Sequence, residues 1–416
     1  MSHADTRCTA IGFSRRSLLQ GSAALAGTSL ARTGSAAAGS ATRPVLIQVF
    51  LRGGMDGLTT VAPYGDPFLY SQRPRLAIQP PGQVHGAVDL DGFFGLAPAA
   101  APLMTPYGNG HLAIVHAMGS TDATRSHFEA FSLMEYGDPS LAPGVISTGW
   151  AARYLESMTT PSSGDLRGIG VGTILPYTLR GAPKTLPIAN LANFDFPGLE
   201  LSAAERRAHL AAAYALRRPG VADPALDTME LFGLGGIDFA NYVPENGAQY
   251  TSSNFGARLR HSAALIKADF GVEVISIDLF GWDLHLGLGP IDGAMAGLLD
   301  NLTRNLEAFY LDMLGHLDDY VVVVLSEFGR HVRTNGSAGV DHGHGNAMFV
   351  MGRNIVGGQV IANWPGLHPS DQDQGDLAIT IDYRDILGEV LVGCLGVTDL
   401  APIFPGYTLT PRGVTV

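Results

Sequence analysis

Several short stretches of the chain are almost continuously apolar. They are residues 44–51, 112–118, 272–279 and 320–326, and a shorter run covers 347–351. Continuous apolar runs of this length are typical of strands in a parallel sheet that is covered on both faces. The pattern therefore predicts five strands of a buried sheet.

Helical patterns lie between these runs. From Met295 to Leu317, apolar residues recur at spacings of three and four, as on a helix with one buried face. Another helix is expected to begin near Ser126, and a last one to run from about Tyr383 to Leu395. Strands that alternate with helices predict an α/β fold with a mostly parallel central sheet flanked by helices.

The region from about 140 to 260 is less regular and rich in Gly, Pro, Ala and Asn. We interpret it as an insertion with a cap-like role inside one α/β domain, which would span residues 39–416. No internal repeat divides that domain further.

The N-terminus has a different character. Arg15 and Arg16 precede a mildly apolar segment, 20–31, and a run of small residues, 34–38. This order is typical of a twin-arginine signal peptide, which would cover residues 1–38. We therefore expect the twin-arginine export machinery as a partner and a bacterial periplasmic or secreted location. The apolar segment is too short for stable membrane insertion, which needs about twenty residues.

Composition narrows the possible partners. The 416-residue chain has a formal net charge of −12, which argues against binding to nucleic acid or anionic lipid through bulk charge. Cys8 lies in the expected signal peptide, so Cys394 would be the one thiol of the exported protein. An intrachain disulfide is therefore excluded after cleavage.

Acidic and imidazole side chains follow the predicted strands. Ligands of open α/β sheets bind outside the carboxyl ends of the strands, and the residue types found there are typical of a metal site. The candidate metal ligands are Asp56, His127, Asp283, His285, Glu327, Asp341, His342 and His344. Alternate residues of an extended segment point the same way, so Asp283 with His285, or His342 with His344, could present two ligands to one ion.

Mixed carboxylate and imidazole donors favour a divalent metal, with zinc first and manganese, iron or calcium as alternatives. Single residues could also have structural roles without binding metal. Asp56 after a strand could form a turn or cap a helix. His116, inside a predicted strand, is expected to be a core residue.

The turn after the second predicted strand, before the helix that begins near Ser126, is the natural place for a nucleophile. A hydroxyl of Ser126 at a helix N-terminus would receive the positive end of the helix dipole. Ser126 could equally be an ordinary N-cap that forms a capping box with Glu129. Arg125 and Arg330 are the candidates for gripping an anionic group through paired N–H donors.

Five motifs in this order resemble one known family. They are Arg52-Gly-Gly-Met-Asp-Gly, Arg125-Ser-His-Phe, Gly281-Trp-Asp-Leu-His, Ser326-Glu-Phe-Gly-Arg and Asp341-His-Gly-His-Gly. Behind a twin-arginine leader they look like the DUF1501 family of exported bacterial proteins, which is grouped with the alkaline phosphatase and sulfatase superfamily. The resemblance implies an alkaline phosphatase-like fold with metal-binding residues at Asp56, Asp283 and His285. Glu327 falls where that superfamily usually has Asp-His, and His342 or His344 where it has a final His ligand.

The resemblance implies an exported metal-dependent hydrolase. Its substrate would be a phosphate or related anionic ester, either a small molecule or linked to a glycan. The Cys/Ser-x-Pro-x-Arg motif of formylglycine sulfatases does not occur in the sequence, so that class is disfavoured. Two alternatives are a non-catalytic metal- or glycan-binding protein of the same fold and a phosphotransferase.

Overall fold

The structure, a computed structural model, describes residues 43–140, 146–158, 166–194, 202–217, 228–229, 231 and 236–416. The expected signal peptide, 1–38, lies outside the described residues. Among the described helices, none is long and apolar enough to cross a membrane.

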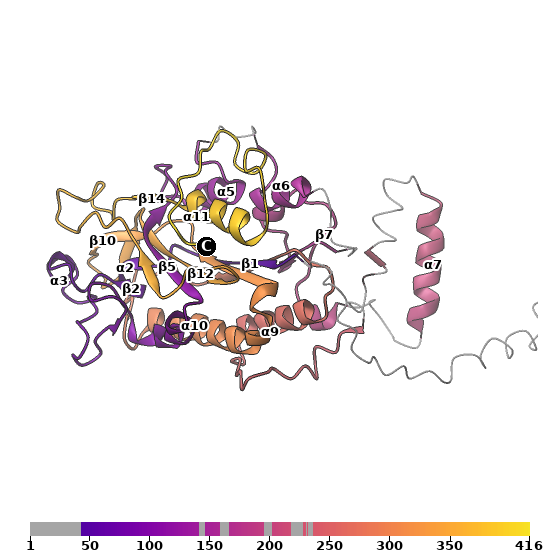
Figure 1. The fold of residues 1–416 in the computed structure, drawn as a ribbon, viewed down its shortest axis with the longest axis horizontal. Coiled ribbons are helices and arrows are strands. Elements are labelled where there is room, and N and C mark those ends of the chain that lie inside the picture. Colours follow the sequence, from indigo (N-terminus) through magenta and orange to yellow (C-terminus); the bar gives the residue numbers. More distant parts are fainter. Residues whose placement is uncertain are drawn as a thin grey trace, which may run out of the picture. The chain divides into compact units, whose positions relative to one another are not determined.

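A nine-stranded sheet forms the centre of the domain (Figure 1). Its strand order is β13-β5-β12-β9-β1-β8-β6-β7, with β14 also paired to β5. The antiparallel pairs are those of β12 with its two neighbours, and the other pairs are parallel. The strands are β1 (Val45–Arg52), β5 (Leu112–Gly119), β6 (Gly168–Val171), β7 (Thr185–Pro187), β8 (Val274–Phe280), β9 (Tyr320–Leu325), β12 (Asn346–Gly352), β13 (Gln359–Ile361) and β14 (Ile381–Asp382). The predicted fold class is confirmed, and each of the five predicted strands is present.

Helices cover both faces of this sheet (Figure 1). On one face lie α9 (Asn254–Lys267) and α10 (Ala294–Asp312), and on the other lie α5 (His127–Tyr136), α6 (Trp150–Ser157) and α11 (Tyr383–Glu389). Alternate residues of β1 point to opposite faces, so Ile47 and Val49 join the first core, and Leu46 and Phe50 join the second. This double burial explains why the strands are apolar throughout.

Smaller elements surround the sheet. The hairpin of β10 (Arg330–Thr334) and β11 (Val340–His342) forms one small sheet, and β2 (Val61–Ala62), β3 (Val88–Asp89) and β4 (Gly95–Leu96) form another. The remaining α-helices in the described part of the chain are α2 (Gly57–Thr60), α3 (Phe68–Gln72), α4 (Met104–Gly108) and α7 (Ala203–Ala215). Among the residues that the structure describes, 3₁₀ helices cover Pro98–Leu103, Tyr177–Leu179, Leu191–Asn193 and Leu314–Asp319.

Three details differ from the sequence-based expectations. The region around 140–260 contributes β6 and β7 to the central sheet and α9 to its cover, so it belongs partly to the core. The helix predicted up to Leu317 ends at Asp312 and continues as a 3₁₀ turn. The last helix changes from α to π geometry at Val390.

Candidate metal centre

The centre lies where three neighbouring parallel strands end. β9, β1 and β8 are adjacent in the sheet, and Glu327, Gly53 and Asp283 follow their carboxyl ends. The hairpin β10–β11 adds His342, and α5 begins with His127. Gly53 has φ +116°, and a Cβ there would stand 2.6 Å from the backbone nitrogen of Asp283. Glycine therefore allows the ends of β1 and β8 to approach closely.

Three histidine rings converge on one carboxylate oxygen. Oδ1 of Asp283 lies 3.3 Å from Nε2 of His127, 3.0 Å from Nε2 of His285 and 3.2 Å from Nε2 of His342. The Nε2 atoms of His285 and His342 are themselves 2.9 Å apart. The four side chains thus direct their polar atoms to a common point.

The opposite nitrogen of each ring contacts an acceptor. Nδ1 of His127 lies 2.6 Å from Oε1 of Glu327, Nδ1 of His285 lies 3.0 Å from Oδ1 of Asp341, and Nδ1 of His342 lies 2.7 Å from the carbonyl of Arg125. These acceptors assign the N–H to Nδ1 in every ring. In a neutral imidazole, each Nε2 then carries a lone pair facing Asp283. Lone pairs around a carboxylate repel one another, and a cation between them removes that repulsion.

The donor set fits a divalent metal. The ligand atoms of His127, Asp283 and His342 all lie within 4.8 Å of one another, and His285 contacts two of these three residues. Nε2 of His127 is buried and has no hydrogen-bond partner among the described residues. Imidazole nitrogens with one carboxylate suit zinc, manganese or iron better than calcium, which prefers oxygen ligands alone.

Arg330 holds Asp283 from inside the fold. Its side chain is fully buried, and its Nη2 donates to Oδ1 of Asp283 over 2.6 Å. The same guanidinium donates to four backbone carbonyls, those of Gly53, Gly54, Trp282 and Val340. Although partial burial acts in the opposite direction, this arginine lowers the pKa of Asp283 to about 2. Arg330 was expected to grip an anionic ligand, but the structure uses it to fix a metal-ligand candidate.

Glu327 supports His127. Its Oε1 accepts hydrogen bonds from Nδ1 of His127 over 2.6 Å and from the backbone N–H of Gly53 over 2.8 Å, and its Oε2 accepts one from Ser326 over 2.9 Å. The hydrogen bond to Glu327 raises the pKa of His127. Predicted as a metal ligand, Glu327 lies behind a ligand candidate, in the position from which carboxylates orient metal-binding histidines.

Asp56 lies in a separate buried cluster. Its Oδ2 forms an ion pair with Arg73 and accepts a hydrogen bond from Thr59 over 2.6 Å. Asp56 also occupies the N-cap position of α2, without a side-chain bond to the helix backbone. Arg73, completely buried, was missed by sequence reasoning. Nothing in its local sequence distinguishes it from a surface arginine.

The polar residues of the motif that begins at Asp341 have different surroundings. His342 enters the group, Asp341 supports His285 from an exposed position, and His344 turns to Asp373, with 3.2 Å between Nδ1 and Oδ2. His342 and His344 therefore do not share one point, although their spacing suggested it. Gly343 packs against the backbone of Arg330, where a Cβ would come within 2.5 Å.

The turn before α5 contributes through its backbone. The Arg125 carbonyl accepts from His342, while the Arg125 guanidinium pairs with the buried carboxylate of Asp376. Ser126 is the N-cap residue of α5, but its hydroxyl makes no capping bond. Glu129 accepts a hydrogen bond from Thr124 instead. The expected capping box is therefore absent. His116, expected in the core, is completely buried.

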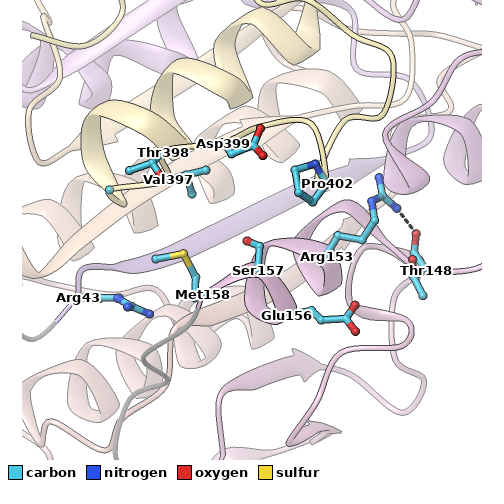
Figure 2. Close-up of a pocket in the computed structure, with 11 residues that line it drawn as sticks. Arg43, Thr148, Arg153, Glu156, Ser157, Met158, Val397, Thr398, Asp399 and Pro402 are labelled. Carbon is cyan, nitrogen blue, oxygen red and sulfur yellow. Dashed lines mark hydrogen bonds between the residues drawn. The ribbon is translucent and has the colours of Figure 1, made fainter.

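A cavity of about 580 Å³ lies away from this centre (Figure 2). Arg43, which precedes β1, lines it, so the cavity is near the amino end of that strand, whereas the centre follows the carboxyl end. Figure 2 shows Arg153 bonded to the Thr148 carbonyl, and the same guanidinium also binds the carbonyls of Tyr136 and Ile403. No histidine lines this cavity.

Residues 241–384 match the sequence model of a family described as "Protein of unknown function (DUF1501)". The matched segment includes the motifs that begin at Gly281, Ser326 and Asp341. It confirms the predicted family resemblance for these three motifs, and the motifs that begin at Arg52 and Arg125 lie outside the matched segment. No curated protein matches the chain significantly.

Solved structures similar to this chain have low sequence identity to it. A protein in the alkaline phosphatase superfamily from Vibrio parahaemolyticus is 12% identical, with a TM-score of 0.42, over 89% of this chain and 71% of the other. A protein named Ps i-CgsB, in complex with a neocarrahexaose, is 11% identical, with a TM-score of 0.37, over 88% and 74%. A Bacteroides thetaiotaomicron protein described with the metabolism of multiple glycosaminoglycans is 11% identical, with a TM-score of 0.34, over 89% and 79%.

Proposed function

We propose that this protein is a metal-dependent hydrolase of a phosphate or related anionic ester, with one divalent cation at the centre. The observation that carries the proposal is the convergence of three Nε2 atoms on Oδ1 of Asp283. His127, Asp283 and His342 would hold the cation, and His285 would complete the set. A bound cation would supply Lewis-acid polarisation of the ester and make an attacking water more acidic.

The surrounding residues would keep these ligands in place. Glu327 fixes the tautomer and orientation of His127, and Arg330 fixes the orientation of the Asp283 carboxylate. Because both oxygens of Glu327 accept hydrogen bonds and Asp56 pairs with Arg73 in a separate cluster, the geometry favours one cation over a two-metal site. Arg125, with a side chain 35% exposed and paired with Asp376, is the arginine whose guanidinium an anionic group could reach.

The experiment is turnover of a phosphomonoester, a phosphodiester and a sulfate ester by zinc-, manganese- or iron-reconstituted protein. Asp283→Ala and His342→Ala should abolish turnover of the preferred class and metal retention together. His209→Ala, on the exposed surface of α7, is the matched control and should change neither. Turnover that persists in Asp283→Ala would overturn the proposed mechanism.

A non-catalytic metal-binding role is the second candidate. Both arginines that were expected to bind an anionic substrate already have carboxylate partners: Arg330 is buried and pairs with Asp283, and Arg125 pairs with Asp376. This observation favours the non-catalytic role. This candidate predicts full metal retention with no turnover of any of the three ester classes. It also predicts that saturating ester leaves the metal affinity unchanged.

Export is a separate part of the proposal, supported by the twin-arginine pattern at Arg15 and Arg16. Residues 1–38 fused to a folded reporter should direct it to the bacterial periplasm. The double substitution Arg15→Lys and Arg16→Lys should retain the reporter in the cytoplasm. Equal export of both fusions would contradict the assignment.

A further inference from the structure

A second cavity, of about 420 Å³, opens beside the metal centre. Its lining comes from the ends of β1, β8 and β6, from α5 and from the loop after β6. β1, β8 and β6 are consecutive in the sheet, so this cavity lies at the carboxyl edge that carries the centre.

Two residues connect the cavity to the centre. α5 begins with His127, and Phe131, one helical turn later, lines the cavity with its ring centroid 5.9 Å from that of His127. Phe280 lines the cavity at the end of β8, three residues before Asp283. A ligand held at the centre could therefore extend into this space.

The rim of the cavity is apolar and exposed. Ile174 is 81% exposed, Phe280 66% and Tyr177 40%, although burial of such side chains is normally favourable. Exposed apolar groups gathered around a cavity mark binding surfaces more often than isolated exposed residues do. These three side chains are suited to cover an apolar group.

The floor of the cavity is electrically balanced. Arg52 pairs with Glu135 over 2.8 Å and with Asp278 over 2.9 Å. Its guanidinium also lies over the Phe131 ring, 4.7 Å from the centroid. Arg258, which also lines the cavity, donates to the Asp278 carbonyl over 2.9 Å. Two arginines face two carboxylates, so the floor offers no excess charge to an ion. A neutral occupant fits this floor.

We propose that this cavity binds the apolar, ring-containing organic group of the ester, so that the preferred substrates are esters of bulky apolar alcohols. This inference rests on the proposed function for its place in catalysis. The cavity itself uses none of the four residues of the centre, so its ligand can be tested without metal.

The probe is 2-naphthol, the alcohol of 2-naphthyl phosphate, titrated into metal-free protein and followed by its fluorescence. The wild type should bind it saturably, and the double variant Ile174→Ser and Phe280→Ser should bind it about tenfold or more weakly, because two apolar contacts are removed. Val243→Ser, at a residue 79% exposed outside the cavity, is the matched control and should bind like the wild type.

Absence of saturable binding, or equal affinity of wild type and double variant, would overturn the inference. Asp283→Ala should still bind 2-naphthol, which separates this result from failure of the metal centre. In reconstituted protein, the double variant should raise KM for 2-naphthyl phosphate about tenfold and leave kcat/KM for ethyl phosphate unchanged. Equal effects on both esters would also contradict the assignment.

Discussion

Nδ1 of His127 lies 2.6 Å from Oε1 of Glu327, and this contact joins the first residue of α5 to the end of β9. The carboxylate is buried and also binds the Gly53 N–H and the Ser326 hydroxyl. A group held by three neighbours has one orientation. The contact therefore fixes the ring of His127 so that Nε2 points to Asp283.

Glu327→Gln should weaken zinc binding about 10–100-fold. The amide oxygen can still accept a hydrogen bond from Nδ1 of His127, but the negative charge that makes the imidazole a stronger ligand is lost. Zinc affinity can be measured by competition with a chromogenic chelator. Asp341→Asn, at the more exposed support of His285, should have a smaller effect. Equal affinities of wild type and Glu327→Gln would show that Glu327 has no positioning role.

Arg330→Met should destabilise the fold by about 3–5 kcal/mol, because it leaves four backbone carbonyls and the Asp283 carboxylate without their buried guanidinium donor. Urea unfolding followed by fluorescence gives the free energy of unfolding. Arg304→Met removes an exposed helical pair with Asp300 and should cost about 0.3–0.5 kcal/mol. Similar values for the two variants would contradict the assigned role of Arg330.

His116 should make the stability depend on pH. Burial lowers its pKa to about 4, against the effect of its contact with the Val61 carbonyl. Its neutral form contributes fully above about pH 6.5, the usual unfolded value, and this contribution is lost as pH falls, by about 3 kcal/mol at pH 4. In His116→Gln, the free energy of unfolding should depend less on pH between about pH 4 and pH 6.5. An unchanged slope would refute the prediction.

Ser126→Ala should retain turnover to within about tenfold, because its hydroxyl makes no capping bond and no hydrogen bond joins it to an acid or imidazole of the described residues, whereas a serine nucleophile needs such a base. The measurement is kcat on the preferred ester, with metal content checked for each preparation. A loss of about 10³-fold at unchanged metal content would instead identify Ser126 as the nucleophile.

The sheet could be predicted because strands buried on both faces are continuously apolar, and this pattern is visible in the sequence. The apolar run at 320–326 is typical of a central strand, and β9 is central in the sheet. By contrast, β6 and β7 are short and lie toward one edge of the sheet. Their segment contains glycine and proline, so its pattern resembled that of an insertion.

The candidate site could be predicted as a set of residues, but not as a set of roles. Asp283 follows strand β8 and His342 ends the hairpin β10–β11, and the topology of the fold brings them together. Whether Glu327 faces the centre or supports His127 depends on side-chain direction, which spacing along the chain does not encode. Arg73 and Asp376 neutralise Asp56 and Arg125 from distant positions, and only the tertiary structure shows those pairs.

The most direct test of the account is the metal content of purified protein after zinc loading and exhaustive dialysis, measured by elemental analysis. Wild-type protein should retain one zinc per chain. The triple variant His127→Ala, Asp283→Ala and His342→Ala, with folding confirmed by circular dichroism, should retain none. Equal zinc content in the two proteins, or none in the wild type, would contradict the existence of this metal centre.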